Sequence, residues 1–303
     1  MPQHDRSQIA ELAHLYVDGA FDRRELLRRV AFVTGSLAAA TMALEAVGLP
    51  APAADPECDP CPADVRVPED AADLEVLHQV QFPGAAGPLF AHQARPRHAP
   101  PLPGLLVIHE NRGLNDHIRD VTRRAARAGF VAVGLDLLSR FGGTPDDPEE
   151  ALRLYQQTTA DGRLADLLSA LDYLHTLGSV QGDKLGAVGF CAGGGNCWNL
   201  ALTTEALSAA VVFYGAPVPP VDGLDTLVCP VLALYAELDR TLTRSVLPVI
   251  TRLEDLQKPF GFSIYEGTNH AFHNDTGANY HRSAACDAWG KTTAFFQKHL
   301  TEA

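Results

Sequence analysis

The sequence predicts an α/β fold in which a mostly parallel, doubly wound sheet carries helices on both faces. From about residue 72, short apolar runs alternate with longer segments of helical periodicity. These runs are apolar throughout rather than at every second position, which is typical of strands covered on both faces. Alternation of strands and helices places consecutive strands parallel in one sheet.

The first expected element is a hairpin of antiparallel strands, residues 74–82 and 88–93, around Gly84 and Gly87, because glycines between two strand-like runs mark a turn. Six further short apolar runs are expected as strands: Leu105–Ile108, Val131–Leu135, Leu185–Phe190, Ala210–Phe213, Val231–Tyr235 and Gly261–Tyr265. The segments between and after them have helical spacing: Asp116–Ala128, Pro148–Thr158, Leu164–Leu177, Gly194–Thr203, Ser245–Leu256 and Ser283–Leu300. In such sheets, ligands bind at the carboxyl ends of the strands.

Length and charge narrow the class of protein. The 303 residues suffice for one large α/β domain or two ordinary ones, and 46% hydrophobic residues can bury a sizeable core. With 37 acidic and 24 basic residues, the net charge is −13, which disfavours nucleic-acid binding. The body of the chain has no uncharged apolar run of membrane-spanning length, so we expect no stable membrane span in the mature domain.

Composition divides the chain into an N-terminal extension (1–54), a Pro-rich linker (55–70) and an α/β domain (71–303). Two arginine pairs within 22–29 precede a mildly apolar, Ala-rich stretch at 30–49. This order resembles a twin-arginine signal that would export the protein to the periplasm and then be removed. The alternative is a retained amphipathic helix on a cytoplasmic protein, since Ile9, Leu12, Leu15 and Tyr16 have helical spacing.

Two of the six cysteines, Cys58 and Cys61, lie in the linker. They lack the strand-and-helix context of a thioredoxin-type motif and the further ligands of a zinc site. Free thiols or a local disulfide remain, and an oxidised pair would favour export. A redox thiol protein that uses this pair is the alternative function from another class. Cys197, Cys229 and Cys286 are expected as buried core thiols.

The most informative motif is Gly189-Phe190-Cys191-Ala192-Gly193. It has the G-x-S-x-G spacing of a nucleophile elbow, a sharp turn between strand and helix, with cysteine in place of serine. Glycines on both sides let the strand and helix approach closely. Cys191 is therefore a candidate nucleophile at the N-terminus of a helix, where the helix dipole is expected to lower the pKa of a thiol.

Two further candidates follow later strands. Asp239 comes after the strand that ends at Tyr235, and His270 comes after the strand that ends at Tyr265. The order nucleophile, acid, histidine is that of the α/β-hydrolase fold. His270 would take or share the thiol proton and protonate the leaving group, while Asp239 would fix the imidazole tautomer. Glu237 competes with Asp239 for this role.

A loop at 109–114 supplies the remaining candidates. It follows the strand that ends at Ile108, where the second donor to an oxyanion is expected. The backbone N–H groups of Asn111 and Ala192 are the expected oxyanion donors. Glu110 is unusual there, because a carboxylate repels developing negative charge, and proton handling at the thiol would explain it.

Taken together, Gly-Phe-Cys-Ala-Gly-Gly, His-Glu-Asn-Arg-Gly-Leu-Asn, Glu-Leu-Asp and Gly-Thr-Asn-His-Ala-Phe resemble the dienelactone hydrolase (carboxymethylenebutenolidase) family over about residues 70–300. The resemblance implies an enzyme that opens a small ester or lactone through a Cys–His–Asp triad and a thioester. It places those roles on Cys191, His270 and Asp239, and a thiol-activating switch on Glu110. It implies no metal and no organic cofactor.

One departure limits the expected substrate. The family places an arginine for the substrate carboxylate four residues beyond the histidine, where this chain has Asn274, so a less charged ester or lactone is expected. Tyr214, just past a strand, either lines the pocket or is a core tyrosine with a bonded hydroxyl. The same site would also suit an acyltransferase or a promiscuous phosphotriesterase. The sequence leaves the oligomeric state open, a homodimer included.

Overall fold

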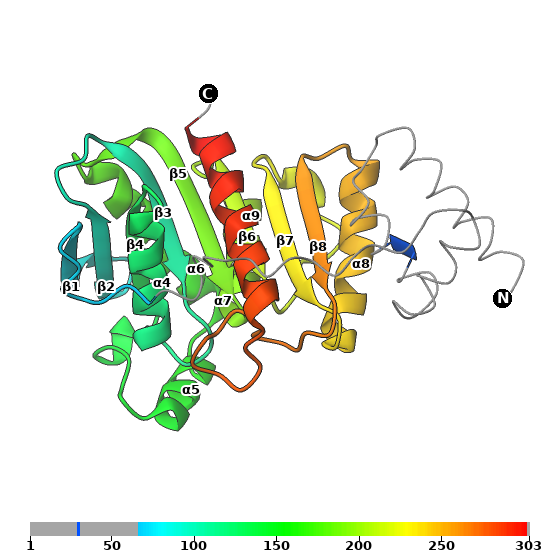
Figure 1. Ribbon diagram of the computed structural model, residues 1–303, viewed down its shortest axis with the longest axis horizontal. Coiled ribbons are helices and arrows are strands. Elements are labelled where there is room, and N and C mark those ends of the chain that lie inside the picture. The colour runs from blue at the N-terminus through cyan, green and yellow to red at the C-terminus, as the bar shows by residue number, and fades with distance from the viewer. Residues whose placement is uncertain (1–28, 31–65, 302–303) are drawn as a thin grey trace, which may run out of the picture. The chain divides into compact units, whose positions relative to one another are not determined.

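An eight-stranded sheet forms the centre of the protein (Figure 1). The computed structural model describes residues 29–30 and 66–301. The strands lie in the order β1-β2-β4-β3-β5-β6-β7-β8. Only the β1–β2 and β2–β4 pairs are antiparallel, and all other neighbours are parallel. The strands are β1 (Leu74–Gly84), β2 (Gly87–Pro96), β3 (Leu102–Ile108), β4 (Val131–Asp136), β5 (Val180–Phe190), β6 (Ala209–Phe213), β7 (Val231–Ala236) and β8 (Phe260–Tyr265).

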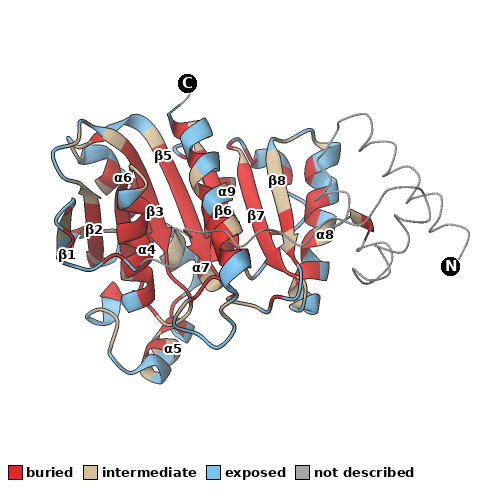
Figure 2. Cartoon of the chain, viewed as in Figure 1, coloured by how far each residue is buried: buried red, intermediate tan, exposed pale blue. Residues whose placement is uncertain are grey.

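Helices cover both faces of the sheet, as the apolar strands predict. α4 (Asp116–Arg127) and α9 (Arg282–Leu300) pack on one face, and α6 (Ala160–Thr176), α7 (Ala192–Thr203) and α8 (Arg240–Asp255) pack on the other. The short helix α5 (Pro148–Gln156) packs against the same hydrophobic core as α6, α7 and α8. Figure 2 shows the central strands buried and the outward faces of the helices exposed.

The hairpin, the six later strands and the six helices are confirmed, with small differences at their ends. β5 begins at Val180, five residues earlier than expected, because Val180 already pairs with Leu102 of β3, before an irregularity in the register that ends where Leu185 pairs with Gly104. α8 begins at Arg240, directly after Asp239, and α6 begins at Ala160 after a Thr159 cap. The Thr159 side chain accepts from Gly162 N, and a cap of this kind satisfies a free N–H group and moves a helix start ahead of its apolar periodicity. Asp239 makes no such side-chain cap at the start of α8.

Strand register brings the candidate residues to one edge of the sheet. Ile108 of β3 pairs with Gly189 of β5, and Phe190 pairs with Phe213 of β6. Ala236 of β7 pairs with Tyr265 of β8. The parallel strands therefore end together, and the loops that follow them meet at this edge.

One cysteine differs from the prediction. Cys197 and Cys229 are buried free thiols, as expected, but Cys286 of α9 takes part in a disulfide. The apolar sequence around Cys286 did not indicate a disulfide, because a disulfide-bonded cysteine is buried as readily as a free thiol. Cys58 and Cys61, the signal-like segment and the linker up to residue 65 lie outside the described residues.

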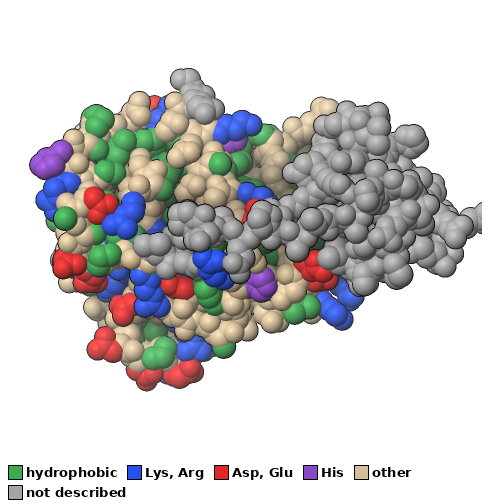
Figure 3. Space-filling model, in the orientation of Figure 1, with side chains coloured by type: hydrophobic (Ala, Val, Ile, Leu, Met, Phe, Trp, Pro, Cys, Tyr) green, Lys and Arg blue, Asp and Glu red, His purple; other side chains and the backbone are tan. Residues whose placement is uncertain are grey.

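On the face shown in Figure 3, Lys and Arg side chains are interspersed with Asp and Glu rather than gathered into one basic patch. Exposed side chains of opposite charge also form ion pairs, for example Arg127–Asp73 and Arg112–Glu149. Among the described helices, none is long and apolar enough to cross a membrane.

Candidate active site

Cys191 lies on a strained turn between β5 and α7. Its φ of 54° and ψ of −119° place a non-glycine residue in a sparsely populated region. Such strain persists only where the surroundings enforce it, and it is common at functional sites. The Cys191 N–H donates to Phe213 O at 3.0 Å, and the Cys191 carbonyl accepts from Gly195 N and Ala216 N. These bonds hold the backbone of the turn from two sides.

The glycines around Cys191 are required by close backbone contacts. A Cβ on Gly189 would lie 2.1 Å from Gly193 O, and a Cβ on Gly193 would lie 2.4 Å from the carbonyl oxygens of Ile108 and His109. Gly194 and Gly195 approach the loop after β6 in the same way, at 2.6 Å from Gly215 Cα and 2.3 Å from Ala216 O. The glycine run therefore serves close packing of α7 between two loops.

His270 and Asp239 are in contact. His270 Nδ1 lies 2.6 Å from Asp239 Oδ2, and both side chains are partly exposed. The carboxylate accepts the Nδ1 proton, which leaves Nε2 of a neutral imidazole free to act as a base. The Tyr214 ring lies beside the imidazole, with 5.0 Å between ring centroids.

Backbone bonds between the loops after β7 and β8 set this contact. Leu238 N donates to Thr268 O, and Glu237 N donates to Tyr265 O. The side chain of Glu237 accepts from Gly267 N at 2.9 Å. Glu237 thus stabilises the loop after β8, while Asp239 is the carboxylate that contacts His270.

Glu110 is buried directly after β3. Asn274 Nδ2 donates to Glu110 Oε2 at 2.9 Å. Thr276 donates to Asn274 Oδ1 through both its N–H and its hydroxyl, which fixes the orientation of the amide. Asn274 therefore holds the carboxylate without cancelling its charge.

The Cys191 thiol is held in its neutral form. Burial, and then the negative charge of Glu110, raise its pKa to about 12. The backbone N–H groups of Ala192 and Asn111 oppose this rise, and Asp239 adds to it. The helix N-terminus was expected to lower the pKa of the thiol, but burial and two nearby carboxylates outweigh it.

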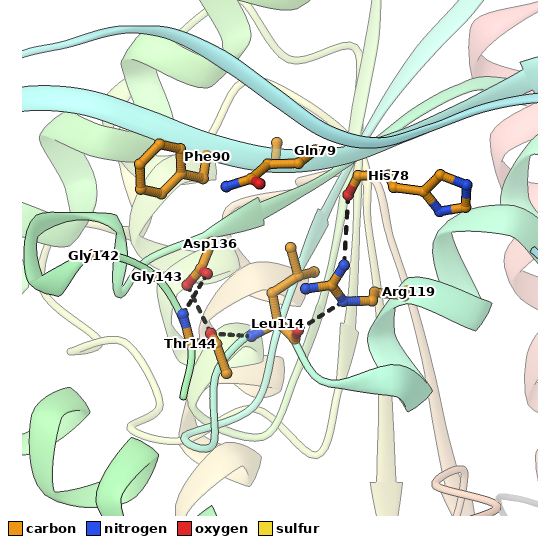
Figure 4. A pocket seen from close by; sticks show the side chains of 10 residues that line it. His78, Gln79, Phe90, Leu114, Arg119, Asp136, Gly142, Gly143 and Thr144 are labelled. Atoms are coloured by element: carbon orange, nitrogen blue, oxygen red, sulfur yellow. Dashed lines mark hydrogen bonds between the residues drawn. The ribbon is translucent and has the colours of Figure 1, made fainter. Parts of the chain in front are cut away.

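A polar clamp holds the loop that carries Asn111 (Figure 4). Thr144 Oγ1 accepts from Leu114 N at 2.8 Å and donates to Asp136 Oδ1 at 2.8 Å. Asp136 Oδ2 also accepts from Thr144 N. Gly113, at φ +78°, passes so close to Thr144 that a Cβ would lie 2.2 Å from its hydroxyl. The clamp fixes the backbone direction of the loop.

A cavity of about 120 Å³ opens beside this clamp, lined in part by Gln79, Phe90 and Arg119. Arg119 donates to Leu114 O and to His78 O across it (Figure 4). Cys191, His270 and Asp239 are not among its lining residues. The cavity is therefore distinct from the site around the thiol.

Two tyrosines lie near the thiol. Tyr214 is fully buried, and its hydroxyl has no hydrogen-bond partner among the described residues. The second is Tyr155 of α5, which the sequence did not single out. Its hydroxyl accepts from Asn196 Nδ2, and its ring packs under Arg163. Burial raises the pKa of Tyr155, and Cys191 contributes to the rise. Its position in an ordinary amphipathic helix gave no signal.

Three histidines that do not contact Asp239 make contacts within the fold. His109 Nε2 accepts from Leu137 N in the core, and His281 caps α9 by accepting from Ala284 N. His273 is buried among aromatic rings. Within the described part of the chain, no group of three or more His, Cys, Asp or Glu side chains is placed to hold a metal ion.

The strand order and the strained turn between β5 and α7 define an α/β-hydrolase fold. Residues 89–300 match the Dienelactone hydrolase family. The chain belongs to this family and is therefore an enzyme of a hydrolase family.

Individual relatives agree with this assignment. A protein of Escherichia coli O157:H7 that bears the name carboxymethylenebutenolidase is 31% identical over 82% of this chain and 94% of its own length. A crystal structure from Klebsiella pneumoniae, ascribed to the dienelactone hydrolases, is 30% identical with a TM-score of 0.68 and covers 74% of this chain and 99% of that one. The dienelactone hydrolase-like promiscuous phosphotriesterase P91 from metagenomic libraries shares the fold at 24% identity, with a TM-score of 0.64 over 75% of this chain and 99% of its own.

The glycine contacts lead to a stability test. Gly193→Ala should lower the free energy of unfolding by about 3 kcal/mol, because its methyl group would overlap two backbone carbonyls. Gly290→Ala in α9 is the matched control, since nothing lies within 4 Å of its Cβ position. It should stabilise the protein by about 0.5–1 kcal/mol. Urea denaturation measures both, and equal stability of the two variants would contradict the packing account.

Proposed function

We propose that the protein hydrolyses a small neutral ester or lactone through a thioester on Cys191. The observation that carries the proposal is that a strained cysteine and a histidine already paired with a carboxylate follow strands that end at the same edge of the sheet. Neighbouring nucleophile, base and orienting acid are the arrangement that covalent acyl transfer needs. Family membership supports the same reaction class.

In the first half of the reaction, Glu110 removes the thiol proton and the thiolate attacks the carbonyl carbon. The N–H groups of Asn111 and Ala192, which already act on the sulfur, would bind the oxyanion of the tetrahedral intermediate. The carbon–oxygen bond of the ester breaks and a thioester remains. The proton then passes from Glu110 to His270 Nε2, and the imidazolium donates it to the departing oxygen, so that Glu110 is again a carboxylate and His270 is again neutral.

In the second half, His270 Nε2 takes a proton from water, and the resulting hydroxide attacks the thioester. The carbon–sulfur bond breaks, and the imidazolium returns its proton to the departing sulfur. Asp239 stabilises the imidazolium through the Nδ1 contact. The products are an acid and an alcohol, or one hydroxy acid from a lactone, and the enzyme returns to its neutral thiol.

Charge around the thiol favours a neutral substrate. Glu110 and Asp239 both raise the pKa of Cys191, so a negative acyl group would meet repulsion there. Asn274 supplies no positive charge to offset it. Alcohols or phosphotriesters could enter the same chemistry, since an oxyanion site also fits a phosphoryl oxygen. Product analysis with added alcohol acceptors and with a phosphotriester distinguishes acyltransferase and phosphotriesterase activity from hydrolysis.

Removal of the nucleophile tests this function. Cys191→Ala should lower kcat/KM for a neutral p-nitrophenyl ester by more than roughly a thousandfold, because no covalent route remains. Cys229→Ala removes a buried free thiol away from the site and should retain activity. Unchanged turnover in Cys191→Ala, with the fold intact by circular dichroism, would rule out the thiol mechanism.

Glu110→Gln should separate two effects of the carboxylate. Its charge raises the pKa of the Cys191 thiol, so the neutral amide should increase the thiolate fraction near pH 7 and speed alkylation by iodoacetamide. The amide cannot take the thiol proton, so ester turnover should fall by roughly a hundredfold. Alkylation slower than in the wild type would contradict the resting role, and unchanged turnover would contradict the switch.

A further inference from the structure

His109 is a fully buried histidine at the start of the 109–114 loop. Its two ring nitrogens contact two different backbone groups. Nε2 lies 3.0 Å from Leu137 N, and Nδ1 lies 2.5 Å from the backbone carbonyl oxygen of Glu110. A backbone N–H only donates and a carbonyl only accepts, so Nε2 carries no proton and Nδ1 carries one. These contacts therefore define a neutral imidazole in a single tautomer.

The surroundings of the ring keep it neutral. Burial lowers the pKa of His109, and Asp136 opposes the decrease without reversing it. The ring packs edge-on against Tyr155, with 6.2 Å between the ring centroids. A second proton would bind Nε2 and would leave the buried N–H of Leu137 without its acceptor. The imidazole is therefore a fixed donor to the Glu110 carbonyl.

The Glu110 carbonyl belongs to the same peptide unit as the Asn111 N–H. In the planar trans form that a non-proline peptide takes, the C=O and N–H bonds point in opposite directions. The carbonyl faces the buried imidazole, so the N–H faces away from it. The hydrogen bond from Nδ1 therefore fixes the direction of the Asn111 N–H as well.

The first turn of α7 lies directly against the start of this loop. The carbonyls of Ile108 and His109 approach Gly193 so closely that a Cβ there would lie 2.4 Å from each oxygen. Cys191 stands two residues before this glycine, at the N-terminus of α7. The Asn111 N–H also acts on the Cys191 thiol, where it opposes the rise in pKa that burial causes. Backbone packing thus brings the peptide that the imidazole holds to the nucleophile.

The other end of the loop is held by the Thr144 clamp. Thr144 Oγ1 accepts from Leu114 N and donates to Asp136 (Figure 4). Leu137, the partner of the imidazole, follows Asp136 directly. Both ends of the loop therefore bond to the end of β4 and the segment after it. Between these ends, the imidazole sets the plane of the peptide that carries the expected oxyanion donor.

We propose that His109 is a positioning residue whose Nδ1–H holds the Glu110 carbonyl, so that the Asn111 N–H stays directed at the oxyanion of the tetrahedral intermediate. The inference rests on the proposed function, in which that N–H binds the oxyanion. The imidazole is fully buried, so it acts through the peptide, and its proton stays on Nδ1 throughout. A donor that is oriented before the reaction needs no reorganisation when the charge develops.

Two substitutions separate the two hydrogen bonds of the imidazole. His109→Asn places an amide as many bonds from Cβ as Nδ1, so it keeps a donor for the Glu110 carbonyl and loses the acceptor of Leu137 N. His109→Gln places an amide as many bonds from Cβ as Nε2, so it keeps that acceptor and loses the donor. Because an unpaired buried N–H is costly, the urea midpoint should be lower for His109→Asn than for His109→Gln.

Activity should follow the opposite order. For a neutral p-nitrophenyl ester, His109→Gln should lower kcat by roughly a hundredfold and leave KM within about twofold, because the oxyanion forms only after binding. His109→Asn should keep kcat and KM within about threefold of the wild type, since the donor is retained. A merely structural role would instead make the less stable variant the less active one.

A small trifluoromethyl ketone reports the oxyanion site directly. With the thiol proton on Glu110, the Cys191 sulfur adds to the carbonyl carbon, and the carbonyl oxygen takes the negative charge. The inhibition constant Ki should rise in His109→Gln by about the factor by which kcat falls, because both depend on the same donor. In His109→Asn, Ki should stay close to the wild-type value.

His92→Gln is the matched control. His92 is also fully buried, with Nδ1 at 3.3 Å from the His78 carbonyl and Nε2 at 3.3 Å from an Arg123 nitrogen. It lies in β2, which β4 and β3 separate from β5 in the sheet. The same substitution there should leave kcat, KM and Ki at their wild-type values.

The wild-type protein supplies a test that needs no altered fold. Nitrogen NMR spectroscopy of protein with isotopically labelled histidine, with His109 assigned by the loss of its signals in His109→Gln, should place the proton on Nδ1. A proton on Nε2 would overturn the inference, and so would wild-type kcat and Ki in folded His109→Gln. A larger loss of activity in His109→Asn than in His109→Gln would also overturn it.

Failure of the proposed function is a separate result. If Cys191→Ala keeps full turnover, the thiol mechanism is wrong and the inference falls with it. If Cys191→Ala is inactive and His109→Gln keeps wild-type kcat and Ki, only the role of His109 is wrong.

Discussion

The burial of the Cys191 thiol beside the Glu110 carboxylate is the interaction on which the account of this site depends. Cys191 is half-buried next to a negative charge, so its thiol stays neutral and its pKa rises to about 12. If Cys191 is the nucleophile, as proposed, it therefore needs a proton acceptor at the moment of reaction. The strained turn, the glycine contacts and the clamp on the 109–114 loop keep thiol and carboxylate together.

The Asp239–His270 pair is held by contacts separate from those that hold Glu110. His270 and Asp239 are held by bonds between the loops after β7 and β8, while Glu110 and Asn274 connect the loops after β3 and β8. In the proposed mechanism, these two carboxylates would serve two different chemical tasks at the thiol. Under that proposal, one group removes a proton and another returns it, and the different surroundings of the two groups would allow acid and base steps at the same pH.

The sequence predicts most of this architecture, because the decisive patterns are local. Continuous apolar runs identified the parallel strands, and the glycines around Cys191 marked a turn whose backbone leaves no room for a Cβ. The Asp239–His270 contact could be anticipated from their places after successive strands. The long-range electrostatics could not be predicted. The helix N-terminus suggested an acidic thiol, but burial and Glu110 reverse the direction of the pKa shift. Tyr155 and the disulfide of Cys286 depend on tertiary neighbours that no local pattern shows.

The central claim is that acyl groups are carried on Cys191. Rapid-quench mass spectrometry of the protein during turnover of a neutral ester, followed by peptide mapping, measures this directly. The account predicts a transient mass increase equal to one acyl group, located on the peptide that contains Cys191 and absent in Cys191→Ala. Full turnover with no acyl adduct on this cysteine, or with an adduct on another residue, would contradict it.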